Sequence, residues 1–194
     1  MSNNQTSRAA RGNDQWLKQY YLTRAAFSSL WVATALTAGQ HSFAVAAALL
    51  IIYPAWDAVA NVIDAVRSGG LAANRSQAIN VAASSVMTIA VILALTMNMN
   101  WVLGAFGLWA IFSGLLQLGT AVRRWRTSGG QWVMILSGAQ SSVAGVLFIF
   151  QAQRPQEPSI ATVAGYAGVG AFYFLVSAIW LTIALSRRSM HPIS

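Results

Sequence analysis

The sequence contains no cysteine and few charged residues. Only 8% of its 194 residues are Asp, Glu, Lys or Arg, whereas an ordinary soluble domain holds about 25%. So little charge cannot cover the surface of a soluble globule of this length. The lack of cysteine excludes a disulfide framework, a thiolate metal site and a cysteine nucleophile. Acidic residues are scarcest, 4 against 12 basic ones, which gives a net charge of +8.

Long apolar runs are what the sequence has in abundance. Hydrophobic residues make up 56% of the chain, and they gather in six runs, at 20–39, 43–66, 78–97, 101–122, 132–150 and 160–185. Each run is close to the roughly 20 residues that a helix needs to cross about 30 Å of hydrocarbon. The runs do not alternate in polarity as barrel strands do. The sequence therefore predicts an all-α integral membrane bundle of six transmembrane helices.

The basic residues favour one side of such a chain. Arg154 lies in a loop on one side, and Arg24 lies inside the first run. Ten others fall in segments of the opposite side: Arg8, Arg11, Lys18, Arg67, Arg75, Arg123, Arg124, Arg126, Arg187 and Arg188. The positive-inside rule then predicts a multi-pass protein of the bacterial inner (plasma) membrane with both termini cytoplasmic. These arginines are expected to contact membrane lipids, which leaves no basic face for nucleic acid.

Paired serines recur on the odd-numbered runs. Arg24–Leu30 aligns with Asn80–Val86 at a shift of 56 residues, and Ser137–Val143 follows at a further 57. On the even runs, Ala65–Arg67 repeats 56 residues later as Ala121–Arg123. Such a period predicts three copies of one helical hairpin, all pointing the same way, whereas many transporters use inverted copies. We expect a cytoplasmic polar tail at 1–19, hairpins at 20–75, 76–130 and 131–188, and a cytoplasmic tail at 189–194, within one membrane domain.

The segment Tyr53-Pro54-Ala55-Trp56-Asp57-Ala58 and the tract Trp109–Leu118 carry a family resemblance. Together with the three hairpins and short outer turns, they make residues 16–188 similar to the HdeD-like family of small six-span bacterial membrane proteins. The resemblance implies a protein built from a short repeat of unknown function and linked to acid or envelope stress. No catalytic residues are established for that family, so the resemblance assigns none. This sequence departs from the enteric pattern by placing Asp57 and Asp64 in the second run.

Three charged residues lie inside the predicted spans: Arg24, Asp57 and Asp64. Asp57, Asn61 and Asp64 share one helix face because they are spaced i, i+4 and i+7. An antiparallel hairpin brings Arg24 level with Asp57 or Asn61. We therefore predict that Arg24 points into the bundle and pairs with Asp57 or Asp64. A milder polar stripe occupies the equivalent places in the second copy: Asn80, Ser113, Gln117 and Thr120.

Three functions stay open for this polar network. It can fix helix register in a non-enzymatic protein of unknown molecular activity. It can serve a small transporter or proton-conducting protein in which Asp57 titrates. The chain can also be an intramembrane scaffold that binds a protein or lipid partner, or a second copy of itself. An enzyme is not expected, because no nucleophile elbow or phosphate loop occurs, and neither a cofactor nor a metal is expected.

Small residues and tryptophans predict how the helices pack. Residues that permit close helix approach recur every four positions: Ala25, Ser29, Ala33 and Thr37 on the first run, Gly138 and Ser142 on the fifth, and Ala161 and Gly165 on the sixth. The paired serines are expected to bond back to carbonyls one turn earlier in their own helices. Four tryptophans deep in the runs are expected to pack or to face lipid: Trp31, Trp56, Trp109 and Trp180.

Overall fold

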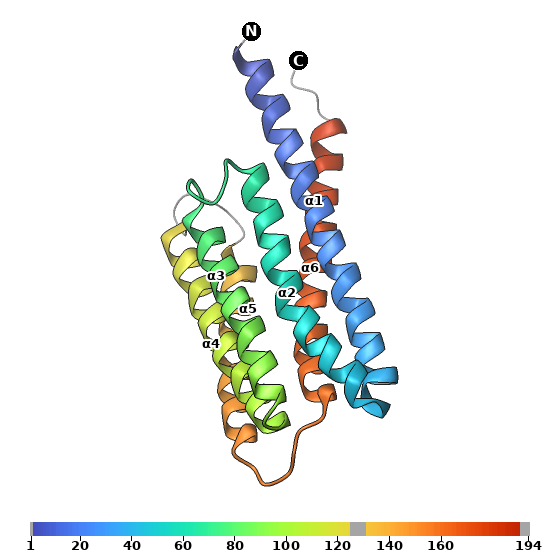
Figure 1. The fold of residues 1–194 in the computed structure, drawn as a ribbon. Coiled ribbons are helices and arrows are strands. Elements are labelled where there is room, and N and C mark those ends of the chain that lie inside the picture. The colour runs from blue at the N-terminus through green and yellow to red at the C-terminus, as the bar shows by residue number, and fades with distance from the viewer. Residues whose placement is uncertain (1, 125–130, 191–194) are drawn as a thin grey trace. The chain divides into compact units, whose positions relative to one another are not determined.

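The computed structural model describes residues 2–124 and 131–190, which are almost entirely helical. They form α1 (Ser2–Thr34), the π-helix η1 (Ala35–Gly39), α2 (Phe43–Arg67), α3 (Arg75–Leu95), α4 (Met99–Arg124), α5 (Gln131–Ala152) and α6 (Ile160–Met190) (Figure 1). The all-α prediction is confirmed. Helices α2 to α6 begin and end within a few residues of the predicted runs, because the apolar runs set their lengths.

Helix α1 extends further than the sequence predicted. Residues 1–19 are assigned above to a polar tail, yet α1 begins at Ser2. The segment has no proline, and it contains Ala, Arg and Gln, which are strong helix formers. At its other end α1 passes into η1, where Thr37 Oγ1 donates to the Ala33 carbonyl at 2.8 Å and Gln40 Nε2 donates to the Leu36 carbonyl at 2.7 Å.

Five helices of the described chain are long and apolar enough to cross a membrane. They are α2, α3, residues Met99–Val122 of α4, residues Met134–Ala152 of α5 and residues Ile160–Arg187 of α6. Large aliphatic side chains on these helices are exposed, among them Val86, Leu108 and Ile179. A lipid environment accepts such faces, which water would not. The chain is therefore a membrane protein.

The chain divides into two parts, and each is described by itself. The first part holds residues Met1–Leu30 and Ala167–Ser194, where the N-terminal portion of α1 lies beside the C-terminal portion of α6 (Figure 1). The ring of Tyr21 stacks on that of Phe174 with centroids 6.2 Å apart. The second part, Trp31–Tyr166, contains α2 to α5.

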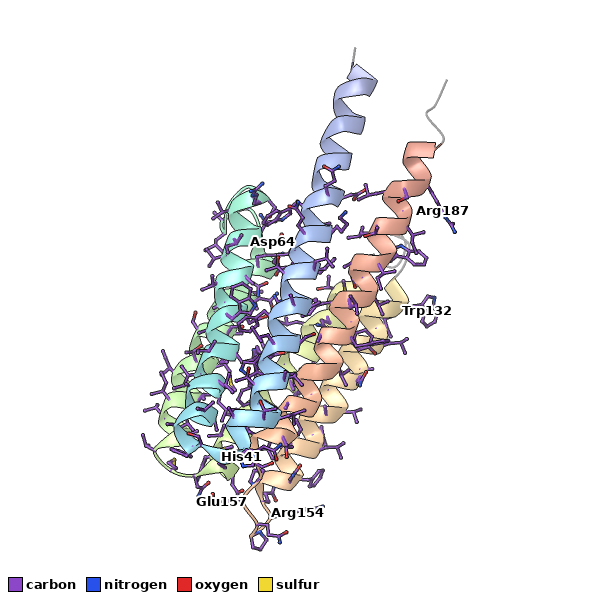
Figure 2. The ribbon with its side chains drawn as sticks, turned by 90° about the vertical axis from the view of Figure 1, so that its right-hand side faces the viewer. His41, Asp64, Trp132, Arg154, Glu157 and Arg187 are labelled. Atoms are coloured by element: carbon purple, nitrogen blue, oxygen red, sulfur yellow. The ribbon has the colours of Figure 1, made fainter. Side chains whose placement is uncertain are left out.

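The second part is a set of antiparallel helices that pack in chain order, α2 on α3, α3 on α4 and α4 on α5. Its fully buried side chains include Leu50, Val91, Leu103 and Phe106. Figure 2 shows His41, Arg154 and Glu157 at one end of this part and Asp64 toward the other. These positions distinguish the end that holds residues 153–159 from the end that holds residues 68–74.

Aromatic residues fill the region around Pro54, which lies inside α2. Proline has no N–H, so the Leu50 carbonyl four residues earlier lacks its usual helical donor and the helix is weakened here. Trp31 Nε1 donates to the Leu49 carbonyl at 2.7 Å, and its ring lies 4.8 Å from that of Tyr53. Tyr53 in turn meets Trp109 edge to face at 6.1 Å. Of the four deep tryptophans, Trp31 and Trp109 therefore pack in this cluster, whereas Trp180 is exposed.

Candidate functional site

The carboxylate of Asp57 is the centre of the intramembrane hydrogen-bond network. Its Oδ2 accepts from Ser84 Oγ at 2.6 Å and from Asn61 Nδ2 at 3.1 Å. Asn61 also donates to the Asp57 carbonyl at 2.8 Å. Asn61 and Ser84 are both buried. Asp57 and Asn61 share a face of α2, as their spacing indicates, and this face meets α3 through Ser84.

A second carboxylate of α2 also accepts a hydrogen bond from a side chain of α3. Asp64 Oδ2 accepts from Gln77 Nε2 at 2.6 Å. Seven residues separate Asp57 from Asp64 on α2, and seven separate Gln77 from Ser84 on α3. Seven residues are two helical turns, or about 10 Å along the axis. The two pairs therefore lie one above the other, and we call these four residues the polar seam. Sequence reasoning missed Gln77, although its spacing from Ser84 is a usable signal.

A second serine forms hydrogen bonds that link three helices. Ser141 Oγ on α5 donates to the Ala110 carbonyl on α4 at 3.0 Å and lies 2.6 Å from the hydroxyl of Tyr166 on α6. A serine hydroxyl has one proton. Since that proton goes to the Ala110 carbonyl, the Tyr166 hydroxyl is the donor to Ser141. Tyr166 was also missed, and no spacing in the sequence distinguishes it from Tyr173.

The expectation that the paired serines bond back within their own helices is only partly right. Ser142 Oγ does so, donating to the Gly138 carbonyl at 2.9 Å. For Ser84 and Ser141 it is wrong, because both bond to neighbouring helices. The first serine of each pair is buried, with 4%, 1% and 8% of Ser28, Ser84 and Ser141 exposed. On a buried face, the acceptor of an adjacent helix comes within reach.

Helices α4 and α5 approach each other through glycine. A Cβ atom added to Gly145 would lie 2.5 Å from the Gly107 carbonyl oxygen, and one added to Gly138 would lie 2.8 Å from that of Gly114. No side chain fits at such distances, so the two backbones touch. Gly138 is part of the small-residue pattern described above, and the other three glycines were not singled out. We call these four residues the glycine seam.

The milder stripe of the second copy lies on half-buried positions. Asn80 on α3 and Ser113, Gln117 and Thr120 on α4 are all partly covered. Gln117 faces α5, since its Cβ would lie 3.1 Å from a Cβ added to Gly138. Its Oε1 is buried and has no hydrogen-bond partner within the described part of the chain. This stripe therefore lies beside the glycine seam.

Arg24 belongs to the first part of the chain. Its Nη1 donates to the Tyr20 hydroxyl at 2.9 Å, and its guanidinium carbon lies 4.5 Å from the ring centroid of Phe174. The side chain thus reaches toward the N-terminal end of α1, the direction in which a snorkelling arginine extends, and makes a cation–π contact. The predicted pairing with Asp57 or Asp64 would join the two parts of the chain and stays a prediction.

Comparison with known proteins bears on the middle of the chain. Neither the curated proteins nor the solved structures contain a match. Residues 82–150 match a family described as a short repeat of unknown function (DUF308). This stretch holds Ser84, Ser141 and the whole glycine seam. Over α3 to α5 the chain is therefore similar to a family of short repeats of unknown function, as the resemblance in its sequence led us to expect.

Proposed function

We propose that the protein is a non-enzymatic, six-span protein of the bacterial inner membrane whose buried polar side chains hold its helices in register. Its remaining span is 20–39, on α1 and η1, and both termini are cytoplasmic. The ten-to-one distribution of basic residues supports this orientation. The link to acid or envelope stress that the HdeD-like resemblance implies, and binding of a protein or lipid partner, stay predictions.

Three hairpin repeats are part of this proposal. Burial of Ser28, Ser84 and Ser141 supports them, because these serines are equivalent under the 56- and 57-residue shifts. The residue two places on is exposed each time, to 70% at Leu30, 66% at Val86 and 60% at Val143. The same inward and outward positions thus recur on α1, α3 and α5.

The bond from Ser84 to Asp57 is the observation that carries the proposed role. It joins α2 and α3 at 2.6 Å, and its donor and acceptor are separated by 27 residues in the chain. In lipid, hydrophobic contact does little to select one alignment of two apolar helices over another. A hydrogen bond between a polar side chain on each helix selects the alignment in which donor and acceptor meet. Ser84 and Ser141 each donate their proton to an acceptor on another helix, as a bond that holds two helices together must.

A double-mutant cycle on Asp57→Ala and Ser84→Ala tests this role. Unfolding free energies measured in detergent should show a coupling energy of about 0.6 to 1.7 kcal/mol, the range found for hydrogen bonds between membrane helices. Ser85→Ala is the matched control, since Ser85 is the exposed neighbour, and its cycle with Asp57→Ala should be additive. Additive losses for Asp57 and Ser84 as well would refute the role.

A further inference from the structure

An amide side chain is exposed in the apolar part of α5. Gln140 lies six residues inside the span Met134–Ala152, which is about 9 Å along the helix axis, and its side chain is exposed. The exposed neighbours on the same side of α5 are apolar, with 58% of Leu136, 60% of Val143 and 60% of Leu147 accessible. Hydrocarbon tails offer an amide neither donors nor acceptors, so lipid is a poor match for this position.

Exposed hydroxyl side chains in the described spans differ from this amide in what they need. Ser85 on α3 and Thr182 on α6 lie five or more residues inside their spans. A hydroxyl can give its one proton to a carbonyl of its own helix, as Thr182 Oγ1 does to Ala178 at 2.8 Å. A carboxamide has two donor hydrogens and an oxygen with two lone pairs, so it can bond to a second molecule as well as to its own chain. Of the amide side chains in the described spans, Gln140 is the one that is exposed.

Gln140 belongs to a row of exposed residues with the spacing of a contact between two helices. The row is Leu136, Gln140, Val143, Leu147 and Phe150, which follow one another at intervals of four, three, four and three residues. These are the intervals of the contact positions in a left-handed pair of helices, the usual arrangement of helices in membranes. One polar residue at such a position selects the register and the number of helices that associate. We call these five residues the α5 stripe.

The α5 stripe lies on the side of α5 that faces away from α4. Gly138 and Gly145 approach α4 closely, and they precede Gln140 and Leu147 of the stripe by two positions. Two positions correspond to about 200° around a helix of 3.6 residues per turn. A partner can therefore cover the α5 stripe without disturbing the glycine seam.

Helix α3 provides the comparison that isolates the role of Gln140. Val86 corresponds to Val143 under the 57-residue shift, and it is exposed to a similar extent, 66% against 60%. The same shift places Ala83 where α5 has Gln140. A row of exposed apolar residues is what any helix presents to lipid. The amide is therefore the feature that distinguishes α5 as an interface.

We propose that α5 pairs with α5 of a second copy of this chain about a two-fold axis along the membrane normal. Copies in one membrane share one orientation, so this axis brings each stripe residue beside the same residue of the other copy. Nε2 of each Gln140 then donates to Oε1 of the other, because a carboxamide is complementary to an identical group. A second copy thus supplies the matching polar group at the right depth. This pairing goes beyond the register-fixing role, which concerns helices within one copy.

Disulfide cross-linking of single cysteines tests the pairing, since the chain has no cysteine of its own. Val143→Cys and its matched control Val86→Cys are oxidised with copper phenanthroline in proteoliposomes at a low protein-to-lipid ratio. We expect a covalent dimer from Val143→Cys and at least about tenfold less from Val86→Cys, because a disulfide forms only where the two Cβ atoms come within about 4.5 Å. Equal yields from the two variants, or no dimer from Val143→Cys, would overturn the proposal and leave lipid or another protein as the cover of this face.

Replacement of the amide tests its part in the pair. In Gln140→Leu, the dissociation constant of the dimer, measured by energy transfer between labelled copies in liposomes, should rise about 3- to 30-fold, the range for polar contacts between membrane helices. Gln140→Asn keeps a self-complementary amide and should lose less. Ser85→Ala, which removes an exposed hydroxyl of α3, is the control and should leave the dissociation constant unchanged. An unchanged dissociation constant in Gln140→Leu would overturn the proposal.

Discussion

A serine hydroxyl has one proton to donate, and in apolar surroundings it bonds to the nearest acceptor group. Ser142 finds the carbonyl of Gly138 in its own helix. Ser84 instead finds the carboxylate of Asp57, and Ser141 finds the Ala110 carbonyl. An ionised acceptor makes a stronger bond than a carbonyl does, so the Ser84 bond is the stronger of the two when Asp57 is ionised.

The environment of Arg24 leads to a prediction about stability. If Arg24 also pairs with Asp57 or Asp64, Arg24→Leu should cost about 3 to 5 kcal/mol, because a carboxylate then loses its counter-charge in a dry interior. Adding Asp57→Leu or Asp64→Leu should restore much of that loss. Thermal unfolding in detergent measures both effects.

The control for Arg24 is Tyr20→Phe, which removes only the hydroxyl that accepts from Nη1. We expect this variant to lose about 0.5 to 1.5 kcal/mol, the worth of one ordinary hydrogen bond. Should Arg24→Leu cost no more than Tyr20→Phe, Arg24 is a snorkelling anchor and the predicted pairing with an aspartate is wrong.

Tyr166 allows a second prediction at this scale. Tyr166→Phe removes the proton that Ser141 accepts but keeps the edge-to-face contact with Phe148, whose ring centroid lies 5.8 Å away. We expect a loss of about 0.5 to 1.5 kcal/mol. In Tyr166→Phe combined with Ser141→Ala, the loss should be less than the sum of the single losses. Additivity in the unfolding free energies would show that the bond contributes nothing.

At the scale of helices, two interfaces use one spacing with opposite chemistry. The polar seam pairs residues seven apart on α2 and α3, and the glycine seam pairs residues seven apart on α4 and α5. Two turns bring an antiparallel pair back to the same faces. In the first interface, hydrogen bonds from α3 side chains to the two carboxylates of α2 fix the register. Glycines fix the second by steric fit, since only they allow the backbones to touch.

Two glycines of α4 provide a matched test of this fit. A Cβ on Gly114 would lie 2.5 Å from the Gly138 carbonyl oxygen, whereas Gly119 has no atom within 4 Å. Gly114→Ala should therefore destabilise by about 1 to 3 kcal/mol through overpacking. Gly119→Ala should be neutral or should stabilise by up to about 1 kcal/mol, because alanine favours a helix. Equal unfolding temperatures for the two variants would contradict the close approach of α4 and α5.

At the scale of the whole molecule, orientation in the membrane is testable. Single cysteines near the termini, Ser7→Cys and Ser189→Cys, should not react with an impermeant thiol reagent in intact cells, because the proposed topology places both segments in the cytoplasm. Gln153→Cys, in an exposed loop, should react and is the positive control. Labelling at 7 or 189 without permeabilisation would reverse or break the six-span topology.

Part of the site follows from spacing within one helix. The shared face of Asp57 and Asn61 was predictable, and the structure adds the bond between them. Gln77, Tyr166 and Ala110 were not found from the sequence, because a partner on another helix depends on how far each helix is rotated about its axis. That rotation is set by side-chain packing between helices, which hydropathy does not encode.

The lengths of the helices and the all-α architecture follow from the sequence alone. In hydrocarbon every backbone group needs a partner within its own segment, so a long apolar run has little choice but to be a helix. Which helices touch, and at what distance, follows from packing. Glycines bring α4 against α5, and carboxylates bind α2 to α3. Serines with one local sequence therefore acquire different partners, since each hydroxyl bonds to the acceptor that its neighbouring helix presents.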